Sequence, residues 1–429
     1  MNEKGMRGSR GLRLFPALFM LASLFIVPGV VFANGQGERA AAKPKVTFFW
    51  ALYDGLTEDY RASLQSAFIK ANPKIQLNIV PVPWDQLHDK LTTALAGGHP
   101  PELSVIGTRW LLEFMGLKAI AEPSKYVSQA TLDNIVPGAK EAVVNGKLMG
   151  LPIAAGARIL AINTSLTTKV PQTMEDLEQD AIAANSPPNN YGMIMIGKKN
   201  AELTDFVYYF YADGGSFFAM NPDGSFGKST VNSPAGVKAL TTMVKLANQD
   251  KVVQPGYLGQ TRMESDPVFY AGKAAYDMIG AWADSAMKRA GSTFKVQYAQ
   301  IPGFAGHPSE PLIVTDSVAF FSGAPEANLQ AAGKFIDFFY KADWKAKFDQ
   351  LIGFPPVTKD AATLPQFSTP LYKALGEAAV HAKGWPLIDG WAQDSDLVWD
   401  AVSKAFLGQM TPQAALDEAA AKIDKSRGM

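Results

Sequence analysis

Residues 45–50 have the sequence KVTFFW, a run of β-branched and aromatic residues that predicts a strand. Downstream, Thr57–Ala71 has helical spacing and Ile75–Val82 alternates as a strand does. A second helical pattern follows at Asp85–Ala96, and an apolar strand at Leu103–Ile106. The order strand, helix, strand, helix, strand is typical of a parallel sheet covered by helices. The sequence therefore predicts an α/β fold.

The ends of these strands are the first places to expect a ligand, because parallel sheets bind ligands outside the carboxyl ends of their strands. In this chain those ends are Trp50–Asp54 and Gly107–Trp110, and each combines a tryptophan with a charged residue. An aromatic ring covers the apolar face of a sugar while charged groups hydrogen-bond its hydroxyls. Trp282, near Asp284, fits the same pattern. A lone tryptophan is more often a core residue, so the core is the alternative at each position.

The rest of the chain continues to alternate between strands and helices. Strands are predicted at Leu148–Ile153 and Ile159–Asn163, joined through Ala154–Gly156. A further strand is predicted at Val314–Phe321, and a long helix at Ser395–Leu407. The sequence shows no repeat that would indicate a solenoid.

Composition excludes several classes of protein. The chain has 429 residues, enough for two or three domains, with 40 basic and 40 acidic residues. A basic stripe for nucleic acid is absent. There is no cysteine, and the 4 histidines lack metal-ligand spacing, so we expect no metal and no cofactor. Hydrolase, phosphate-loop, dinucleotide and zinc-peptidase motifs are missing too, so no catalytic residues are predicted.

Residues 1–33 have the layout of an export signal. Residues 1–13 are basic, Leu14–Ala33 carries no charge, and small residues at its end suit cleavage after Ala33. The alternative is an uncleaved anchoring helix. No cysteine follows that could carry a lipid anchor, and residues 34–44 have the composition of a flexible tether. We therefore expect a periplasmic protein.

Several short motifs point to one family. Residues 272–282, GKAAYDMIGAW, closely resemble the GKAAMxxxGxW stretch of extracellular solute-binding protein family 1, the maltose-binding-like substrate-binding proteins of sugar ABC importers. Five further motifs follow the family's order across residues 45–429: FIKANP (68–73), NGKLMGLP (145–152), DGG (213–215), GFPP (353–356) and GQMTPQAAL (408–416). Two departures, Ala161-Ile162 and Pro101-Glu102, leave the identity of the ligand open.

The resemblance implies a two-lobed periplasmic-binding-protein fold of type II, with hinge crossings and the ligand between the lobes. On that basis we expect lobe 1 at 45–153 and 304–354, and lobe 2 at 154–303 and 355–429. It also implies a monomer that captures a mono- or oligosaccharide by hinge closure and delivers it to the transmembrane subunits of an ABC permease. Neither catalysis nor nucleic-acid binding is expected.

The resemblance further implies which residues bind the ligand. Trp282 is similar to the family's sugar-stacking tryptophan, and Trp399 to a second stacking aromatic. The other implied positions lie on loops of the two lobes or beside an aromatic helix. The resulting ligand-binding set is Trp50, Tyr53, Asp54, Arg109, Trp110, Arg158, Glu202, Asp213, Trp282 and Trp399. The alternatives are a surface role for the two arginines, a turn at Asp213 and a helix cap at Asp54.

Two other functions stay open from the sequence. One is a binder of the same fold for a non-sugar, such as a polyol phosphate or an organic anion, with Arg109 and Arg158 as a charge clamp. The other is a secreted glycan-active enzyme, because the sequence alone cannot place two carboxylates across a glycosidic bond.

Overall fold

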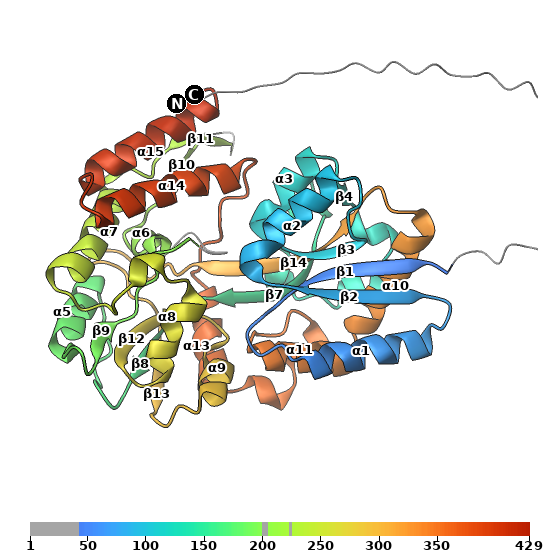
Figure 1. Cartoon of the computed structure of the whole chain (residues 1–429), viewed down its shortest axis with the longest axis horizontal. Coiled ribbons are helices and arrows are strands. Elements are labelled where there is room, and N and C mark those ends of the chain that lie inside the picture. Colours follow the sequence, from blue (N-terminus) through green and yellow to red (C-terminus); the bar gives the residue numbers. More distant parts are fainter. Residues whose placement is uncertain (1–42, 200–204, 223–224) are drawn as a thin grey trace, which may run out of the picture. The chain divides into compact units, whose positions relative to one another are not determined.

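Two β-sheets organise the residues that the computed structural model describes, namely 43–199, 205–222 and 225–429 (Figure 1). We call the part built on the first sheet lobe 1 and the part built on the second sheet lobe 2. The predicted signal, residues 1–33, lies outside the described residues. The residue limits predicted for the two lobes stay a prediction.

The first sheet has the strand order β2-β1-β3-β14-β4, with β7 paired to β14. Strands β2 and β3 both run parallel to β1, which confirms the predicted strand–helix alternation. Its strands are β1 (Lys45–Ala51), β2 (Gln76–Val82), β3 (Leu103–Gly107), β4 (Ile120–Ala121), β7 (Leu151–Ala157) and β14 (Ile313–Phe321). Its principal helices are α1 (Glu58–Ala71), α2 (Trp84–Ala96), α10 (Glu326–Phe339) and α11 (Ala342–Ile352).

The second sheet has the order β13-β8-β12-β9. These strands are β8 (Ile159–Asn163), β9 (Tyr191–Met193), β12 (Ala274–Ile279) and β13 (Val296–Ala299). The helices of this part are α5 (Met174–Ala184), α6 (Phe206–Ala212), α7 (Pro234–Val244), α8 (Arg262–Tyr270), α9 (Ala283–Ala290), α14 (Trp391–Phe406) and α15 (Pro412–Ser426). A buried apolar cluster lies among α6, α7, α14 and α15. Helix α13 (Pro370–Ala379) packs on both β7 and β8.

The remaining elements are short. The strands are β5 (Val143–Val144), β6 (Lys147–Leu148), β10 (Phe218–Met220) and β11 (Phe226–Ser229), which form two hairpins. The helices are α3 (Leu111–Gly116), α4 (Gln129–Asp133) and α12 (Lys359–Ala362). None of the helices in the described residues is long and apolar enough to span a membrane.

The first passage of the chain from one sheet to the other takes a single residue, because β7 ends at Ala157 and β8 begins at Ile159. Figure 1 shows β7 beside β14, and the two pair antiparallel from Ile313 opposite Ala157 to Val318 opposite Leu151. This pairing makes Ala154–Gly156 part of a strand. The predicted break there is wrong, because small residues that suggest a loop are here hydrogen-bonded to a neighbouring strand.

Candidate functional site

A cavity of about 390 Å³ lies between side chains that come from both lobes. Its volume is in the range of small-molecule sites. Lobe 1 contributes residues that follow β1, begin α2, follow β3 or lie on β14, and lobe 2 contributes residues of α8, α9 and the crossing point. The polar and aromatic residues of the lining are Tyr53, Asp54, Trp84, Arg109, Arg158, Lys198, Arg262, Asp266, Tyr270, Trp282, Arg289, Asp316 and Phe354. We call this cavity the first chamber.

On the lobe 1 side, Asp316 is the centre of a buried polar group. The Tyr53 hydroxyl donates a hydrogen bond to its Oδ2 at 3.0 Å. Burial raises the pKa of Asp316 to about 6, although Arg109, Arg158 and the Tyr53 hydrogen bond act in the opposite direction. Burial likewise lowers the pKa of Arg109 to about 10, so its guanidinium stays charged at neutral pH. Gly107 leaves room for that guanidinium, which a Cβ there would crowd.

On the lobe 2 side, Trp282 is held in place by hydrogen bonding and by cations. Its indole Nε1 donates to Asp266 Oδ2 at 3.2 Å, and the Tyr270 hydroxyl donates to the same oxygen at 3.2 Å. The guanidinium carbons of Arg158 and Arg262 lie 4.8 and 5.8 Å from the centroid of the Trp282 ring. Both distances suit cation–π attraction. The ring is therefore oriented before any ligand arrives.

A second buried polar group supports those arginines. Arg262 Nη2 donates to Asp205 Oδ1 at 2.8 Å and to the Tyr208 hydroxyl at 3.0 Å. Arg158 Nε donates to the same hydroxyl at 3.2 Å, so Tyr208 links the two guanidiniums. Burial raises the pKa of Asp266 to about 6, with Arg262 acting against it. At neutral pH the wall therefore offers guanidinium donors beside carboxylate acceptors, the mixture that a polyhydroxyl ligand can satisfy.

One ion pair joins the two lobes beside the chamber. Arg289 on α9 binds Asp54, which follows β1, and both side chains are partly exposed. In this structure the Asp54 carboxylate is therefore held by an arginine of the opposite lobe.

The structure brings five of the predicted site residues together around the first chamber: Tyr53, Asp54, Arg109, Arg158 and Trp282. Trp110 lies beside them in the wall of an adjoining cavity. The alternative of a surface position for the two arginines is wrong, because Arg109 and Arg158 are buried.

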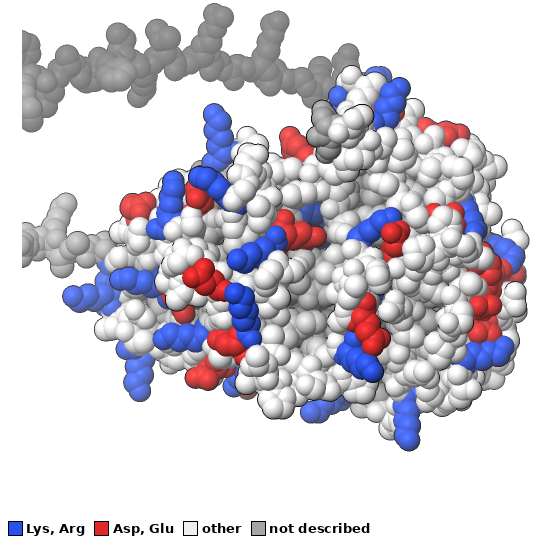
Figure 2. All heavy atoms as spheres, turned by 180° about the vertical axis from the view of Figure 1, so that it is seen from behind, with Lys and Arg blue, Asp and Glu red and all other residues white. Residues whose placement is uncertain are grey.

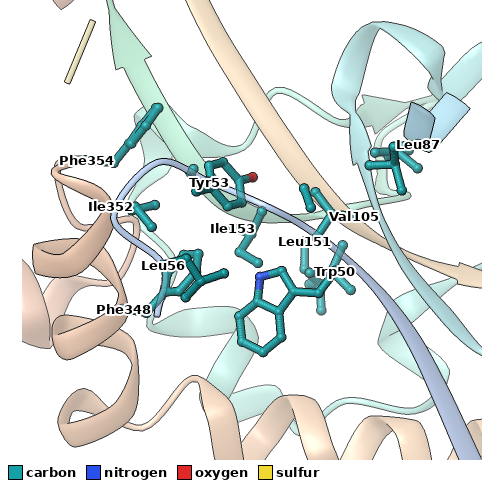
Figure 3. Packing of buried hydrophobic residues seen from close by; sticks show 14 of the residues in the cluster. Trp50, Tyr53, Leu56, Leu87, Val105, Leu151, Ile153, Phe348, Ile352 and Phe354 are labelled. Carbon is teal, nitrogen blue, oxygen red and sulfur yellow. The ribbon is translucent and has the colours of Figure 1, made fainter. Parts of the chain in front are cut away.

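The other predicted positions lie elsewhere. Trp50 is fully buried and belongs to the lobe 1 core shown in Figure 3, among the rings of Phe48, Phe339 and Phe348. Asp213 binds Lys238 at 3.0 Å and lines neither cavity. Trp399 also lines neither cavity, and its indole donates to the Gly197 carbonyl at 3.1 Å. Glu202 lies outside the described residues.

Sequence reasoning missed several residues of the wall. Asp316 interrupts the otherwise mostly apolar strand IVTDSVAFF, and a buried charge in such a strand is a usable signal. Trp84 lies two residues beyond the end of β2 (Gln76–Val82). The expectation that ligands bind outside the carboxyl ends of parallel strands therefore applies to Trp84 as well. Arg262 and Asp266 carry no comparable signal, because a pair spaced by four residues on a helix is usually solvated.

The comparisons with known proteins agree with this geometry. Residues 64–377 match the family model of the bacterial extracellular solute-binding proteins. The chain belongs to this family. The family resemblance predicted from the sequence is thereby confirmed, and family members act as substrate-binding proteins.

Individual relatives cover most of the chain. A protein of Brucella abortus (strain 2308) is 33% identical over 384 residues, which are 87% of this chain and 91% of that protein. The arabinooligosaccharide-binding protein of Bacillus subtilis (strain 168) is 23% identical and covers 95% of this chain and 98% of its own. The structure of maltose-bound T. maritima MalE3 has a TM-score of 0.79 at 22% identity, covering 89% of this chain and 99% of that one. This likeness confirms the predicted two-lobed α/β fold.

Proposed function

We propose that this solute-binding protein captures a carbohydrate in the first chamber and delivers it to an ABC importer. The observation that carries the proposal is the wall itself, where a pre-oriented Trp282 stands beside buried arginines and carboxylates from both lobes. A sugar ring offers an apolar face to the indole and hydroxyls to the charged groups. The arabinooligosaccharide ligand of the B. subtilis relative and the maltose bound to the T. maritima protein support this choice of ligand class.

The proposed mechanism is closure of the two lobes over the sugar. A ligand that touches both walls favours the closed arrangement by its differential affinity for that arrangement. Tyr53, Arg109 and Asp316 would bind from lobe 1, and Arg158, Asp266 and Trp282 from lobe 2. The ion pair between Asp54 and Arg289 joins the two lobes, so it would stabilise the closed arrangement. No chemical step is involved.

The cellular setting is part of the same proposal. We infer export to the periplasm with cleavage after Ala33, a monomeric mature protein, and transmembrane permease subunits as the partner. Nucleic acid has no role in it. On the face drawn in Figure 2, basic and acidic side chains are interspersed, so that face offers no single-sign field to such a polymer.

A thermal-shift screen of residues 34–429 tests the proposal. The panel holds mono-, di- and oligosaccharides, polyols and polyol phosphates. A ligand at 100 times its dissociation constant adds about 2.7 kcal/mol of stability, which for a chain of this size is a shift of several degrees. We expect a shift from one group of sugars, with the sugar recovered intact after incubation.

Other outcomes of the screen point to the other functions. A shift by a phosphate or carboxylate compound alone, lost in Arg158→Ala but kept in Trp282→Ala, would replace the sugar by an anion. Turnover of an oligosaccharide, abolished by a single aspartate-to-asparagine change, would instead show a glycan-active enzyme.

A further inference from the structure

Strand β7, which leads from lobe 1 to lobe 2, contains an irregularity close to the first chamber. Asp316 of β14 pairs with Ala154, but the next residue of β14, Ser317, pairs with Pro152. Ile153 therefore has no partner on β14, which makes it the extra residue of a β-bulge. Bulges bend a strand and redirect nearby side chains, and they are frequent next to active sites. This bulge adjoins Asp316, the carboxylate in the lobe 1 wall of the chamber.

Two buried side chains from one segment bind consecutive carbonyls at the bulge. The Tyr340 hydroxyl donates to the Pro152 carbonyl at 2.8 Å, and Lys345 Nζ donates to the Ile153 carbonyl at 2.9 Å. In a regular strand successive carbonyls point in opposite directions, so one segment can reach both where the strand is irregular. A buried carbonyl without a donor costs free energy, so these two hydrogen bonds stabilise the bulge.

Lys345 is an unusual residue for the position that it occupies. Its side chain and that of Asp349, one turn later on α11, are both fully buried, and the two form an ion pair. Burying two charges removes their hydration, and an apolar pair in the same place often stabilises a fold at least as well. Asp349 Oδ2 is also buried and has no hydrogen-bond partner among the described residues. Core stability alone therefore does not explain the pair, whereas a donor for the Ile153 carbonyl does.

The bulge connects this buried pair to the ligand site. Ile153 belongs to the lobe 1 core drawn in Figure 3, and the two β14 residues beside the bulge are both tied to the chamber side of lobe 1. Asp316 accepts from the Tyr53 hydroxyl, and the hydroxyls of Ser317 and Thr108 share a hydrogen bond of 2.8 Å. Because side chains alternate along a strand, pairing without the extra residue would turn one side of β7 to the opposite face. The bulge therefore fixes the register of β7 at Asp316.

We propose that Tyr340 and Lys345 are positioning residues for Asp316. They stabilise the bulge in β7, and the bulge fixes where the Asp316 carboxylate lies in the wall of the first chamber. Asp349 acts through Lys345, whose ammonium group it orients. This inference rests on the proposed function, since it needs a sugar in that chamber.

Tyr340→Phe tests the proposal with the least disturbance, and Tyr60→Phe is the matched control. Both tyrosines are buried and donate at 2.8 Å to a backbone carbonyl, but the partner of Tyr60 is Trp344 of α11 and not a residue of β7. Wild type is titrated calorimetrically with glucose, maltose, maltotriose, arabinose and α-1,5-linked arabinobiose, and the sugar that it binds most tightly is the probe. We expect Tyr340→Phe to weaken binding about fivefold or more, and Tyr60→Phe to stay within about twofold of wild type. Chemical denaturation should show a similar loss of stability in both variants.

A double-mutant cycle shows whether the effect passes through Asp316. Asp316→Asn keeps an oxygen that can accept the Tyr53 hydrogen bond, so we expect weaker binding of the probe but no complete loss. If the bulge acts by positioning the carboxylate, adding Tyr340→Phe to Asp316→Asn should cost less than about twofold in affinity. A purely structural role of Tyr340 would reduce affinity by the same factor with and without Asp316→Asn.

The ion pair is replaced as a whole, because removing one partner would leave a buried charge unpaired. Lys345→Met combined with Asp349→Leu keeps the core apolar and removes the donor to the Ile153 carbonyl. We expect this variant to unfold cooperatively and to bind the probe about tenfold or more weakly than wild type. Wild-type affinity in this variant would overturn the role of Lys345.

The results separate this inference from the proposed function. Sugar binding by wild type, with equal affinities in Tyr340→Phe and Tyr60→Phe, overturns the positioning inference and keeps the proposed function. Equal losses on the two sides of the cycle also overturn it, and if Asp316→Asn binds too weakly to titrate, the two tyrosine variants decide alone. No binding of any of the five sugars to wild type overturns carbohydrate capture and this inference together.

Discussion

Trp50 and Trp282 look alike in the sequence, since each lies near the carboxyl end of an apolar strand, yet they have different surroundings. Trp50 is still inside β1, paired in register with Pro81, and its ring is enclosed by aromatic side chains of α10 and α11. Trp282 lies three residues beyond the last residue of β12 and faces the first chamber. The position of Trp50 within its strand therefore places the ring on a sheet face, whereas the position of Trp282 beyond its strand lets the ring face the chamber.

Gly280 explains why the second arrangement is possible. A Cβ at that position would overlap the six-membered ring of Trp282. The glycine two residues before the tryptophan is therefore what allows the indole to fold back over the end of the strand. Nothing comparable precedes Trp50, where Phe48 stands at the same spacing and is itself buried.

The largest expected effect is on stability, from Trp50→Ala. Removing a fully buried tryptophan leaves a cavity and costs about 3–5 kcal/mol of unfolding free energy. Chemical denaturation measures the loss. Sugar affinity per folded molecule should stay within about twofold of wild type. A large loss of sugar affinity at unchanged stability would contradict the assignment of Trp50 to the core and would indicate that it binds the ligand.

Trp282→Ala should show the opposite pattern. Its ring lines the chamber and stacks with Arg158, so we expect sugar affinity to fall by at least about tenfold. The unfolding free energy should fall by about 1–2 kcal/mol, less than for Trp50→Ala. Calorimetric titration and denaturation on the same preparation check both values. Unchanged affinity would contradict the assignment.

Gly280→Ala changes the position of the Trp282 indole without removing it. The added methyl group displaces the Trp282 ring, so we expect affinity to fall about as far as in Trp282→Ala. Gly259→Ala is the matched control, since nothing lies within 4 Å of a Cβ at that position. If Gly280→Ala binds sugar as wild type does, ring position does not determine affinity.

Asp316 is expected to make the stability of the protein depend on pH. Its pKa is about 6 in the folded protein and about 3.9 in an unfolded chain, because burial disfavours the charged form. Between these values the folded state binds more protons than the unfolded state, so stability falls as pH rises from about 4 to about 6. We expect wild type to lose stability relative to Asp316→Asn across that window and to stay level above it. Denaturation of both proteins at several pH values measures the difference, and a constant difference would contradict it.

Much of the fold could be predicted from local patterns. The strand at Val314–Phe321 is confirmed within one residue by β14, and Thr57 caps α1 where its helical pattern begins. The local pattern predicts a connection between strands at Ala154–Gly156, but these residues belong to β7. Pairing with β14, a strand more than 150 residues away, overrides the local propensity.

The candidate site was less predictable for the same reason. Arg109 and Trp282 could be named because motifs and strand ends are local features. Asp316 joins the chamber through β14, and Asp266 through its hydrogen bond to Trp282, so both depend on packing between distant segments. Trp50 was expected to bind the ligand because it lies near the end of a strand. Alternation along the strand, however, determines which face of the sheet a residue occupies.

In the proposed mechanism the ligand lies between two lobes that must open to admit it. The chain has no cysteine, so Asp54→Cys with Arg289→Cys places a unique pair on opposite lobes beside the first chamber. A short bismaleimide would then cross-link them. Protein cross-linked with the sugar present is predicted to retain it through dialysis, and protein cross-linked without sugar to take none up, while either single cysteine variant treated alike exchanges sugar freely. Uptake and release in the cross-linked protein at the rate of the uncross-linked protein would contradict ligand capture by lobe closure.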